Sequence, residues 1–292
     1  MRFKSDEGLL QFTCRPYSAA AATATFAQFI NLPANAGLLE PVLFCHQAAL
    51  QALLLYLSRI QMAPTLCYRR NTSSARQALS LDKVVVATDD ARIAKVCRAV
   101  GAEVVMTSKD CANGTERCHE AVTKLGAKHD IVVNIQGDEP LVEPSMIDEV
   151  VEVLRDTPEA VFSTACTPME HEEVPLRHRV KCILDQKGFA IYFSRGILPA
   201  NKAGDVRPFP EPHQDLPYLL HLGLQAYDRK FLGHYCQMAP TPLMLMEDLE
   251  QLKVLENGFK MKVVVVDHCA HGVDVPDDVR HIEKIMAEQG LR

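Results

Sequence analysis

Short runs of β-branched residues, alternating with amphipathic stretches of helical character, dominate the chain from about residue 81 onward. The runs 83–88 and 130–135 have the length of strands and are almost continuously apolar. Strands buried on both faces of a parallel sheet have this pattern, whereas half-exposed strands alternate apolar and polar residues. Strands that alternate with helices therefore predict an α/β fold built on a mainly parallel sheet.

The rhythm changes after residue 165, where strands follow one another without a helix between them. Asp185-Gln-Lys-Gly188 separates two apolar segments and is typical of a hairpin turn. We therefore expect one Rossmann-like α/β domain over residues 81–292, with a mixed sheet that contains an antiparallel insertion. Strands are expected at 83–88, 103–106, 130–135, 160–165, 181–184, 189–193, 219–227 and 262–266, and helices at 90–101, 114–125, 246–257 and 276–288, with a further helix that begins at Pro144.

Residues 1–80 do not share this pattern. They are rich in alanine and poor in acids, and we expect them to form an atypical, poorly ordered N-terminal segment. They carry a net charge of +4, so the total of −6 leaves −10 on the remainder of the chain. A domain with this charge offers no broad basic surface for nucleic acid.

No apolar run is long enough to predict a transmembrane span. The ten cysteines form no C-x-x-C pair, and we expect reduced thiols.

Carboxylates follow two of the predicted strands. Asp138 lies in Gln136-Gly-Asp-Glu-Pro140, and Asp274 lies in Gly272-Val-Asp-Val-Pro-Asp277. Ligands of open α/β sheets bind beyond the carboxyl ends of the strands, and Mg²⁺ prefers one or two carboxylates together with substrate phosphates. A bound Mg²⁺ would also offset the repulsion between an acidic domain and a triphosphate. The alternative is that Asp138 is only a turn residue of a helix-capping loop.

Asn113-Gly-Thr-Glu-Arg117 opens a predicted helix. A glycine at this point lets backbone N–H groups approach an anion, and an arginine adds charge-assisted bonds, although the same residues form an ordinary capping sequence. His268-Cys-Ala-His271 has soft metal ligands but no second ligand pair, so a polar stretch after a strand is the favoured interpretation. His221 interrupts an apolar strand, as core histidines do. Gly-x-Ser-x-Gly, Walker A and Gly-x-Gly-x-x-Gly motifs are absent from the sequence.

Several of these motifs occur together in one order. The chain resembles the 3-deoxy-manno-octulosonate (Kdo) cytidylyltransferases, also called CMP-Kdo synthetases, and among them the plant branch. The resemblance runs from about residue 79 to residue 292 and rests on Val85-Val-Ala-Thr-Asp-Asp90, Asn113-Gly-Thr-Glu-Arg117, Asn134-Ile-Gln-Gly-Asp-Glu-Pro140, Tyr192-Phe-Ser-Arg195, His221-Leu-Gly223, Leu249-Glu-Gln-Leu-Lys253 and Gly272-Val-Asp-Val-Pro-Asp277.

The resemblance implies a nucleotide-diphospho-sugar transferase fold of the GT-A-like kind and a transfer of CMP from CTP to Kdo, with release of pyrophosphate. It implies Mg²⁺ at Asp138 and Asp274, both of them catalytic, and a homodimer. The residues implied to bind Kdo are Gln136, Arg195, His221, Glu250 and Gln251, and those implied to bind the nucleotide are Gly114, Thr115 and Arg117. An arginine fork suits the Kdo carboxylate, and catalysis by positioning and metal charge needs no covalent nucleophile.

One part of the family pattern is missing from residues 1–60. The family begins with a buried strand and a loop close to Ile-Pro-Ala-Arg-x-x-Ser-x-Arg-x-x-Gly-Lys-Pro-Leu that wraps the triphosphate, and this chain has no such sequence. The alternative function is therefore a catalytically impaired or non-catalytic relative. Another sugar nucleotidyltransferase of the same fold is disfavoured by the pairing of 192–195 with 221–223. Cytoplasmic and organelle-associated locations, mitochondrial or plastid, both remain open.

Overall fold

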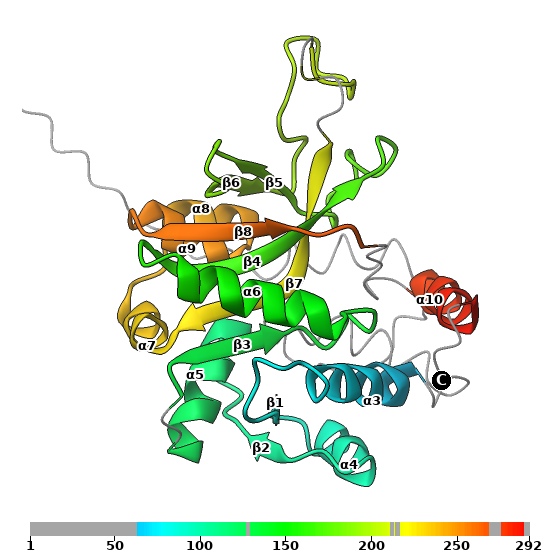
Figure 1. The fold of residues 1–292 in the computed structure, drawn as a ribbon, viewed down its shortest axis with the longest axis vertical. Helices are drawn as coiled ribbons and strands as arrows, with labels where there is room; N and C mark the ends of the chain where they lie inside the picture. Colours follow the sequence, from blue (N-terminus) through cyan, green and yellow to red (C-terminus); the bar gives the residue numbers. More distant parts are fainter. Residues whose placement is uncertain (1–62, 127–128, 211–212, 214–216, 269–275, 289–292) are drawn as a thin grey trace, which may run out of the picture. The chain divides into compact units, whose positions relative to one another are not determined.

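The computed structural model describes residues 63–126, 129–210, 213, 217–268 and 276–288, all of which belong to one compact unit, Cys45–Arg292 (Figure 1). In chain order its elements are α3 (Ala63–Ala75), β1 (Val86–Thr88), α4 (Ala91–Ala99), β2 (Val104–Met106), α5 (Gly114–Leu125), β3 (Ile131–Ile135), α6 (Pro144–Asp156), β4 (Ala160–Met169), β5 (Lys181–Leu184), β6 (Ala190–Ser194), β7 (Tyr218–Asp228), α7 (Arg229–Gln237), α8 (Pro242–Glu247), α9 (Glu250–Glu256), β8 (Lys260–Val265) and α10 (Pro276–Glu288).

The main sheet is mixed, as expected. Its strand order is β6-β5-β7-β4-β8, and β3 also pairs with β7. β7 runs antiparallel to β3, β4 and β5, whereas β4 and β8 are parallel. The β5–β6 pair is an antiparallel hairpin whose turn ends at Gly188, at a φ of +76°. The α/β class and the antiparallel insertion are therefore confirmed. The expectation of a mainly parallel sheet is wrong, because within the described residues only β4–β8 and the separate β1–β2 pair are parallel.

β7 forks between two partners along one of its edges. Its first part pairs with β5 through Leu219 and Leu220, and its last part pairs with β3 through residues 224–228. β4 pairs along the other edge, and its register shifts opposite the same point, between Thr164 and Cys166. Residues 222 and 223 thus lie where regular pairing is interrupted on both sides of the strand. Such irregular points free polar groups that a continuous ladder would use.

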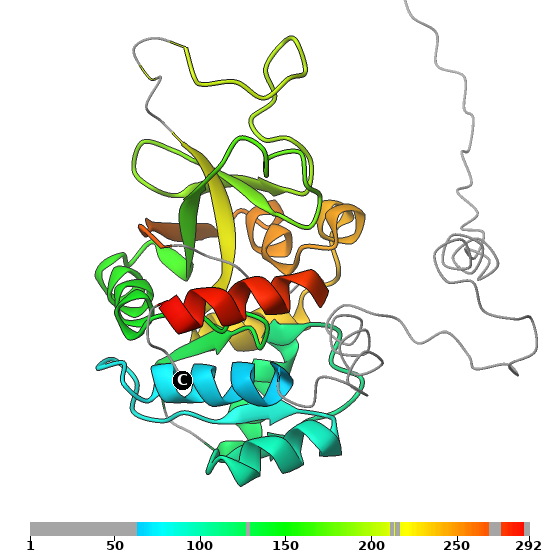
Figure 2. The same ribbon diagram turned by 90° about the vertical axis from the view of Figure 1, so that its right-hand side faces the viewer.

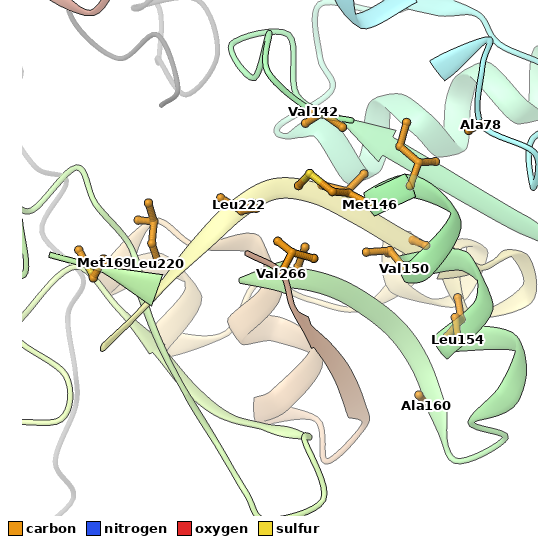
Figure 3. Packing of buried hydrophobic residues seen from close by; sticks show 14 of the residues in the cluster. Ala78, Val142, Met146, Val150, Leu154, Ala160, Met169, Leu220, Leu222 and Val266 are labelled. Atoms are coloured by element: carbon orange, nitrogen blue, oxygen red, sulfur yellow. The ribbon is translucent and has the colours of Figure 1, made fainter. Parts of the chain in front are cut away.

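Two apolar clusters bury the two faces of the sheet. In one of them, α6 packs across β4 and β7, with Met146 and Val150 near Leu222 and Val266 (Figure 3). The other cluster joins β4 and β7 to α7 and α9, which lie on the face opposite α6 in Figure 1. Both faces of β4 and β7 are therefore buried, which explains their long apolar sequences.

Helix α3 belongs to this body, although it falls within the segment expected to be poorly ordered. Ser74 Oγ donates to the carbonyl oxygen of Val142 at 2.6 Å, and Asn71 Nδ2 donates to that of Gln136 at 3.2 Å. Ala75 and Ala78 join the cluster around α6. α3 and α10 both face the viewer in Figure 2. The rest of the expected N-terminal segment, residues 1–62, lies outside the described residues.

The expected strand 83–88 is shorter than predicted. Only Val86–Thr88 pairs, and its partner is β2, which together with β1 makes a separate two-stranded parallel sheet. Within the described part of the chain, β3 pairs with β7 alone. A strand extends only as far as a neighbouring strand supplies hydrogen bonds, so a three-residue partner limits β1 to three residues.

Other differences concern the helices. The single helix expected at 246–257 is wrong: α8 and α9 are separate, and Asp248 between them has a left-handed φ of +53°. Helix α7 lies where no helix was expected.

The seven described cysteines are all free thiols, as predicted for reduced cysteines. Among the described helices, none has the length and apolar character to cross a membrane.

Candidate active site

The close approach of β7 to the loop that follows β3 forms the floor of the site. Gln136 N–H donates to the carbonyl oxygen of Gly223 at 2.8 Å, and Gly223 N–H donates to Glu139 Oε1 at 2.9 Å. A Cβ atom on Gly223 would lie 2.8 Å from Glu139 Cγ and 2.9 Å from Gln136 Cβ. Only glycine therefore fits here, and this contact sets the position of the loop that carries Asp138.

His221 is held as a neutral ring next to this contact. Thr164 Oγ1 lies 2.7 Å from the carbonyl oxygen of Leu224 and 2.9 Å from His221 Nε2. The hydroxyl has one proton, which the carbonyl takes, so Nε2 is the donor and Nδ1 is an acceptor. Gln251 Nε2 lies 3.5 Å from Nδ1, near the limit for a hydrogen bond. Burial lowers the pKa of His221 to about 4, which favours the same neutral form.

A second network joins the start of α5 to the start of α9. The backbone N–H of Thr115 donates to Glu250 Oε2 at 3.1 Å, and its hydroxyl donates to the same oxygen at 2.7 Å. Thr115 Oγ1 also lies 2.8 Å from the hydroxyl of Tyr227 on β7, and that hydroxyl contacts Gln225. The expected nucleotide residue Thr115 and the expected sugar-acid residue Glu250 are thus in direct contact, and Glu250 and Gln251 are neighbours.

Arg117 lies beside the carboxyl ends of β1 and β2. Its Nη1 donates to Thr107 Oγ1 at 2.6 Å and to the carbonyl oxygen of Ser108 at 3.3 Å, and it lies 3.5 Å from Asp89 Oδ1. Gly114 is buried at the first position of α5, and Asn113 caps that helix by accepting from Glu116 N–H. The Asn113–Arg117 motif is therefore both a helix cap and a link between two sheets.

Arg195 follows directly after the end of β6. Phe193, two residues earlier, packs edge-on against the His221 ring at a centroid distance of 4.9 Å. The guanidinium donates to the carbonyl oxygens of Glu247 at 2.7 Å and Asp248 at 3.1 Å. The Glu247 carboxylate in turn accepts from Arg195 N–H at 2.9 Å.

The expected metal site is described only in part. Asp138 lies in the turn after β3, and its negative charge contributes, after burial, to raising the pKa of Cys67 on α3 to about 12. Asp274 lies outside the described residues, as do Cys269 and His271. His268, directly after the end of β8, approaches Glu143 Oε1 at 3.8 Å, so the chain leaves β8 beside the loop that carries Asp138. Among the described residues, no three metal-ligating side chains cluster.

Three side chains of this site were missed by sequence reasoning. Thr164 and Tyr227 lie inside apolar strands, where a hydroxyl is not distinguishable from an ordinary core residue. Glu247 lies in the segment that was expected to be continuous helix. No local pattern indicates that Glu247 turns back to β6, because the break at Asp248 depends on tertiary contacts.

A family model described as cytidylyltransferase matches residues 68–263. The chain is 58% identical over 223 residues to the mitochondrial 3-deoxy-manno-octulosonate cytidylyltransferase of Arabidopsis thaliana. The match covers 76% of this chain and 75% of that protein. It is 57% identical to the enzyme of that name from Zea mays, over 74% of this chain and 70% of that protein.

A bacterial relative and a solved structure agree. The enzyme of the same name from Protochlamydia amoebophila is 40% identical, over 78% of this chain and 86% of that protein. The structure of CMP:2-keto-3-deoxy-manno-octonic acid synthetase complexed with CTP superposes with a TM-score of 0.68 at 30% identity, over 76% of this chain and 88% of that chain. The chain belongs to the 3-deoxy-manno-octulosonate cytidylyltransferases of the cytidylyltransferase family.

The contact at Gly223 yields the first prediction. In Gly223→Ala, the new Cβ atom must push the loop that carries Gln136 away from β7. We expect kcat/KM to fall by about 100-fold, because a misplacement of about 1 Å costs that much in a positioned site. Gly233→Ala is the matched control, since its Cβ atom would meet His119 at an ordinary 3.5 Å. Equal activity of the two variants in steady-state kinetics would contradict the role of this contact.

The half-buried His221 ring yields the second prediction. Its pKa falls from 6.5 in the unfolded chain to about 4 in the folded protein. The unfolded state therefore binds more protons between these values, and the stability that His221 contributes is complete above pH 6.5 and lost as the pH falls toward 4. Urea unfolding of the protein and of His221→Gln, measured from pH 7 to pH 4.5, should show a smaller loss of stability in the variant. Identical pH profiles would contradict a neutral, half-buried His221.

Proposed function

We propose that this chain transfers CMP from CTP to 3-deoxy-manno-octulosonate, giving CMP-Kdo and pyrophosphate. A bond forms between the anomeric oxygen of the sugar acid and the α-phosphorus of CTP, and the bond from that phosphorus to pyrophosphate breaks. The observation that carries the proposal is the convergence at the β7 fork of Gln136, His221 and Gln251 with the Thr115–Glu250 link, in a chain of this family.

The described residues suit a polyhydroxylated acid. Arg195 offers a planar fork of donors for a carboxylate, and it follows β6, whose Phe193 packs against the His221 ring. His221 Nδ1 is an acceptor. Its contact with Gln251, at 3.5 Å, is so weak that a sugar hydroxyl can displace it. Glu250 accepts from Thr115 through one carboxylate oxygen, Oε2, which orients its other oxygen. These groups bind and orient; none of them acts as a nucleophile.

Mg²⁺ is the cofactor that fits the donor set. Asp138 supplies a hard carboxylate at the carboxyl end of β3, and His268, which follows β8, lies beside the loop that carries Asp138. We propose that Asp138 and Asp274 hold the ion, a donor number that Mg²⁺ accepts when phosphates complete its shell. When bound, Mg²⁺ would neutralise charge on the triphosphate.

Assembly and location are also proposals. We propose a homodimer, for which the exposed apolar side chains of α8 are a candidate surface, with Met246 83% and Leu245 68% exposed. We propose an association with an organelle, the mitochondrion, because the Arabidopsis thaliana relative is named as mitochondrial.

The third prediction tests function and metal together. With CTP, Kdo and Mg²⁺, the purified chain should release pyrophosphate and form CMP-Kdo in equal amounts, and omission of any component should abolish release. Asp138→Asn and Asp274→Asn should each reduce the rate to background, because each removes one of two anchors of a single ion. Asp267→Asn, at an exposed position, is the control. Loss in only one of the two variants would contradict a shared site.

A catalytically impaired or non-catalytic relative is the second candidate. It is favoured by the family match, which begins at residue 68, and by the absence from residues 1–60 of the family's strand and Gly-Lys-Pro loop. Charge-assisted bonds contribute roughly 1.5–3 kcal/mol each. If two or three are lost, CTP should bind about 10² to 10⁵-fold more weakly.

The fourth prediction decides between the two candidates. Replacing residues 1–66 by a segment with the family's strand and Gly-Lys-Pro loop should lower the KM for CTP by a factor in that range. The KM for Kdo should change little, because the residues proposed to bind it lie on β7 and α9 and directly after β3 and β6. An unmodified chain with the same KM for CTP as the replaced one would show that other residues of the first 80 bind the triphosphate.

A further inference from the structure

A lysine is completely buried inside the antiparallel insertion. Lys181, at the start of β5, has 0% exposure, and its Nζ donates to three backbone carbonyl oxygens. These belong to Arg179 at 2.6 Å, Arg195 at 2.9 Å and Leu176 at 3.0 Å. An ammonium has three N–H donors, so these bonds use all of them.

Lys181 and Glu247 fix the backbone of Arg195 from both sides. The carbonyl oxygen of Arg195 accepts from Lys181, and its N–H donates to Glu247 Oε2 at 2.9 Å. The other oxygen of Glu247 accepts from the hydroxyl of Ser194 at 2.8 Å. With both neighbouring peptide groups held, the direction of the Cα–Cβ bond of Arg195 is set before any ligand binds.

The side chain of Arg195 is held by the same group of segments. Its guanidinium donates to the carbonyl oxygens of Glu247 at 2.7 Å, Asp248 at 3.1 Å and Arg177 at 3.5 Å. These contacts use three of the five N–H donors of a guanidinium. Arg177 lies between two of the residues whose carbonyls bind Lys181, so the ammonium also fixes the loop that contacts the guanidinium.

We propose that Lys181, together with Glu247, is a positioning residue that aims the guanidinium of Arg195 at the carboxylate of the sugar acid. This inference rests on the proposed function, in which Arg195 takes that carboxylate. Lys181 does not touch the substrate; it acts through the carbonyl oxygen of Arg195 and through the loop at residues 176–179.

The energetics of burial support a positioning role. Burial lowers the pKa of Lys181 to about 8, which reflects the free-energy cost of a cation inside the protein, while the nearby Glu247 acts in the opposite direction. Removing one member of a buried polar network leaves its partners unsatisfied, which for Lys181 are three carbonyl oxygens. The cost of burying the ammonium is therefore offset by bonds that hold these three carbonyl oxygens in one geometry.

The fifth prediction concerns Lys181→Met. This change keeps the length and apolar stem of the side chain but removes its three donors. We expect the KM for Kdo to rise by about tenfold or more, the effect of one weakened charge-assisted bond, while the KM for CTP changes less than twofold. Ser163→Ala is the matched control, because it also removes a fully buried donor to a carbonyl, Val150, on the α6 side of the sheet.

A double-mutant cycle separates positioning from general damage. Because Lys181 acts through Arg195, Lys181→Met should add no further loss of Kdo affinity in an Arg195→Lys background. Glu247→Gln is the second variant in case Lys181→Met fails to fold, since it removes one of the two backbone anchors of Arg195 and should give the same split between the two KM values. Equal changes in both KM values, or full additivity with Arg195→Lys, would overturn the inference and leave the proposed function intact.

The two failures can be told apart. Absence of turnover in the unmodified chain would contradict the proposed function. The positioning claim is then judged by the ¹H–¹⁵N resonance of Arg195 Nε–H. We expect this resonance to shift in Lys181→Met and to remain unchanged in Ser163→Ala; an unchanged resonance in Lys181→Met would overturn the claim.

Discussion

The candidate site depends on a single constraint, the contact between β7 and the loop that follows β3 at Gly223. There the two backbones are joined by a hydrogen bond of 2.8 Å, with no room for a Cβ atom. β7 exchanges its partner β5 for β3 at the same place, and the register of β4 shifts on the opposite edge. Irregular pairing would be costly in a buried sheet unless the freed polar groups found other partners. Thr164, which donates to the carbonyl oxygen of Leu224, and Glu139, which accepts from Gly223 N–H, are partners of this kind.

The polar groups around the fork form two connected sets that meet at the start of α9. Glu250 contacts Thr115, which comes from the nucleotide motif, and Gln251 contacts His221. One helix start thus touches residues that belong to two expected substrate regions. Because α9 is itself held by buried residues such as Leu252 and Val254, these contacts rest on a rigid element. Transfer between two substrates requires fixed relative positions, which this arrangement supplies.

Much of the fold could be predicted from local patterns, and the failures have physical reasons. Continuous β-branched runs indicated the buried strands, and the turn at Asp185–Gly188 indicated the hairpin. The strand at 83–88 was predicted too long because its sequence cannot show that only β2 pairs with it. The helix at 246–257 was wrong because Asp248 adopts a left-handed conformation, which an aspartate tolerates but does not by itself impose.

The site residues were predicted from motifs, while their contacts were not. Nothing local links Thr115 to Glu250, which lie 135 positions apart. The local pattern also does not reveal that the Lys181 ammonium reaches the backbone of Arg195. A lysine before an apolar run is typical of an exposed strand end. Long-range partners of polar groups are set by the register of the sheet, and that register depends on the whole fold.

A crystal structure of the chain with CTP and Kdo would show whether the sugar acid binds at the β7 fork. We expect the Kdo carboxylate against the guanidinium of Arg195 and a sugar hydroxyl between His221 Nδ1 and Gln251. Kdo bound elsewhere, with the 3.5 Å contact between His221 and Gln251 unchanged, would contradict this expectation.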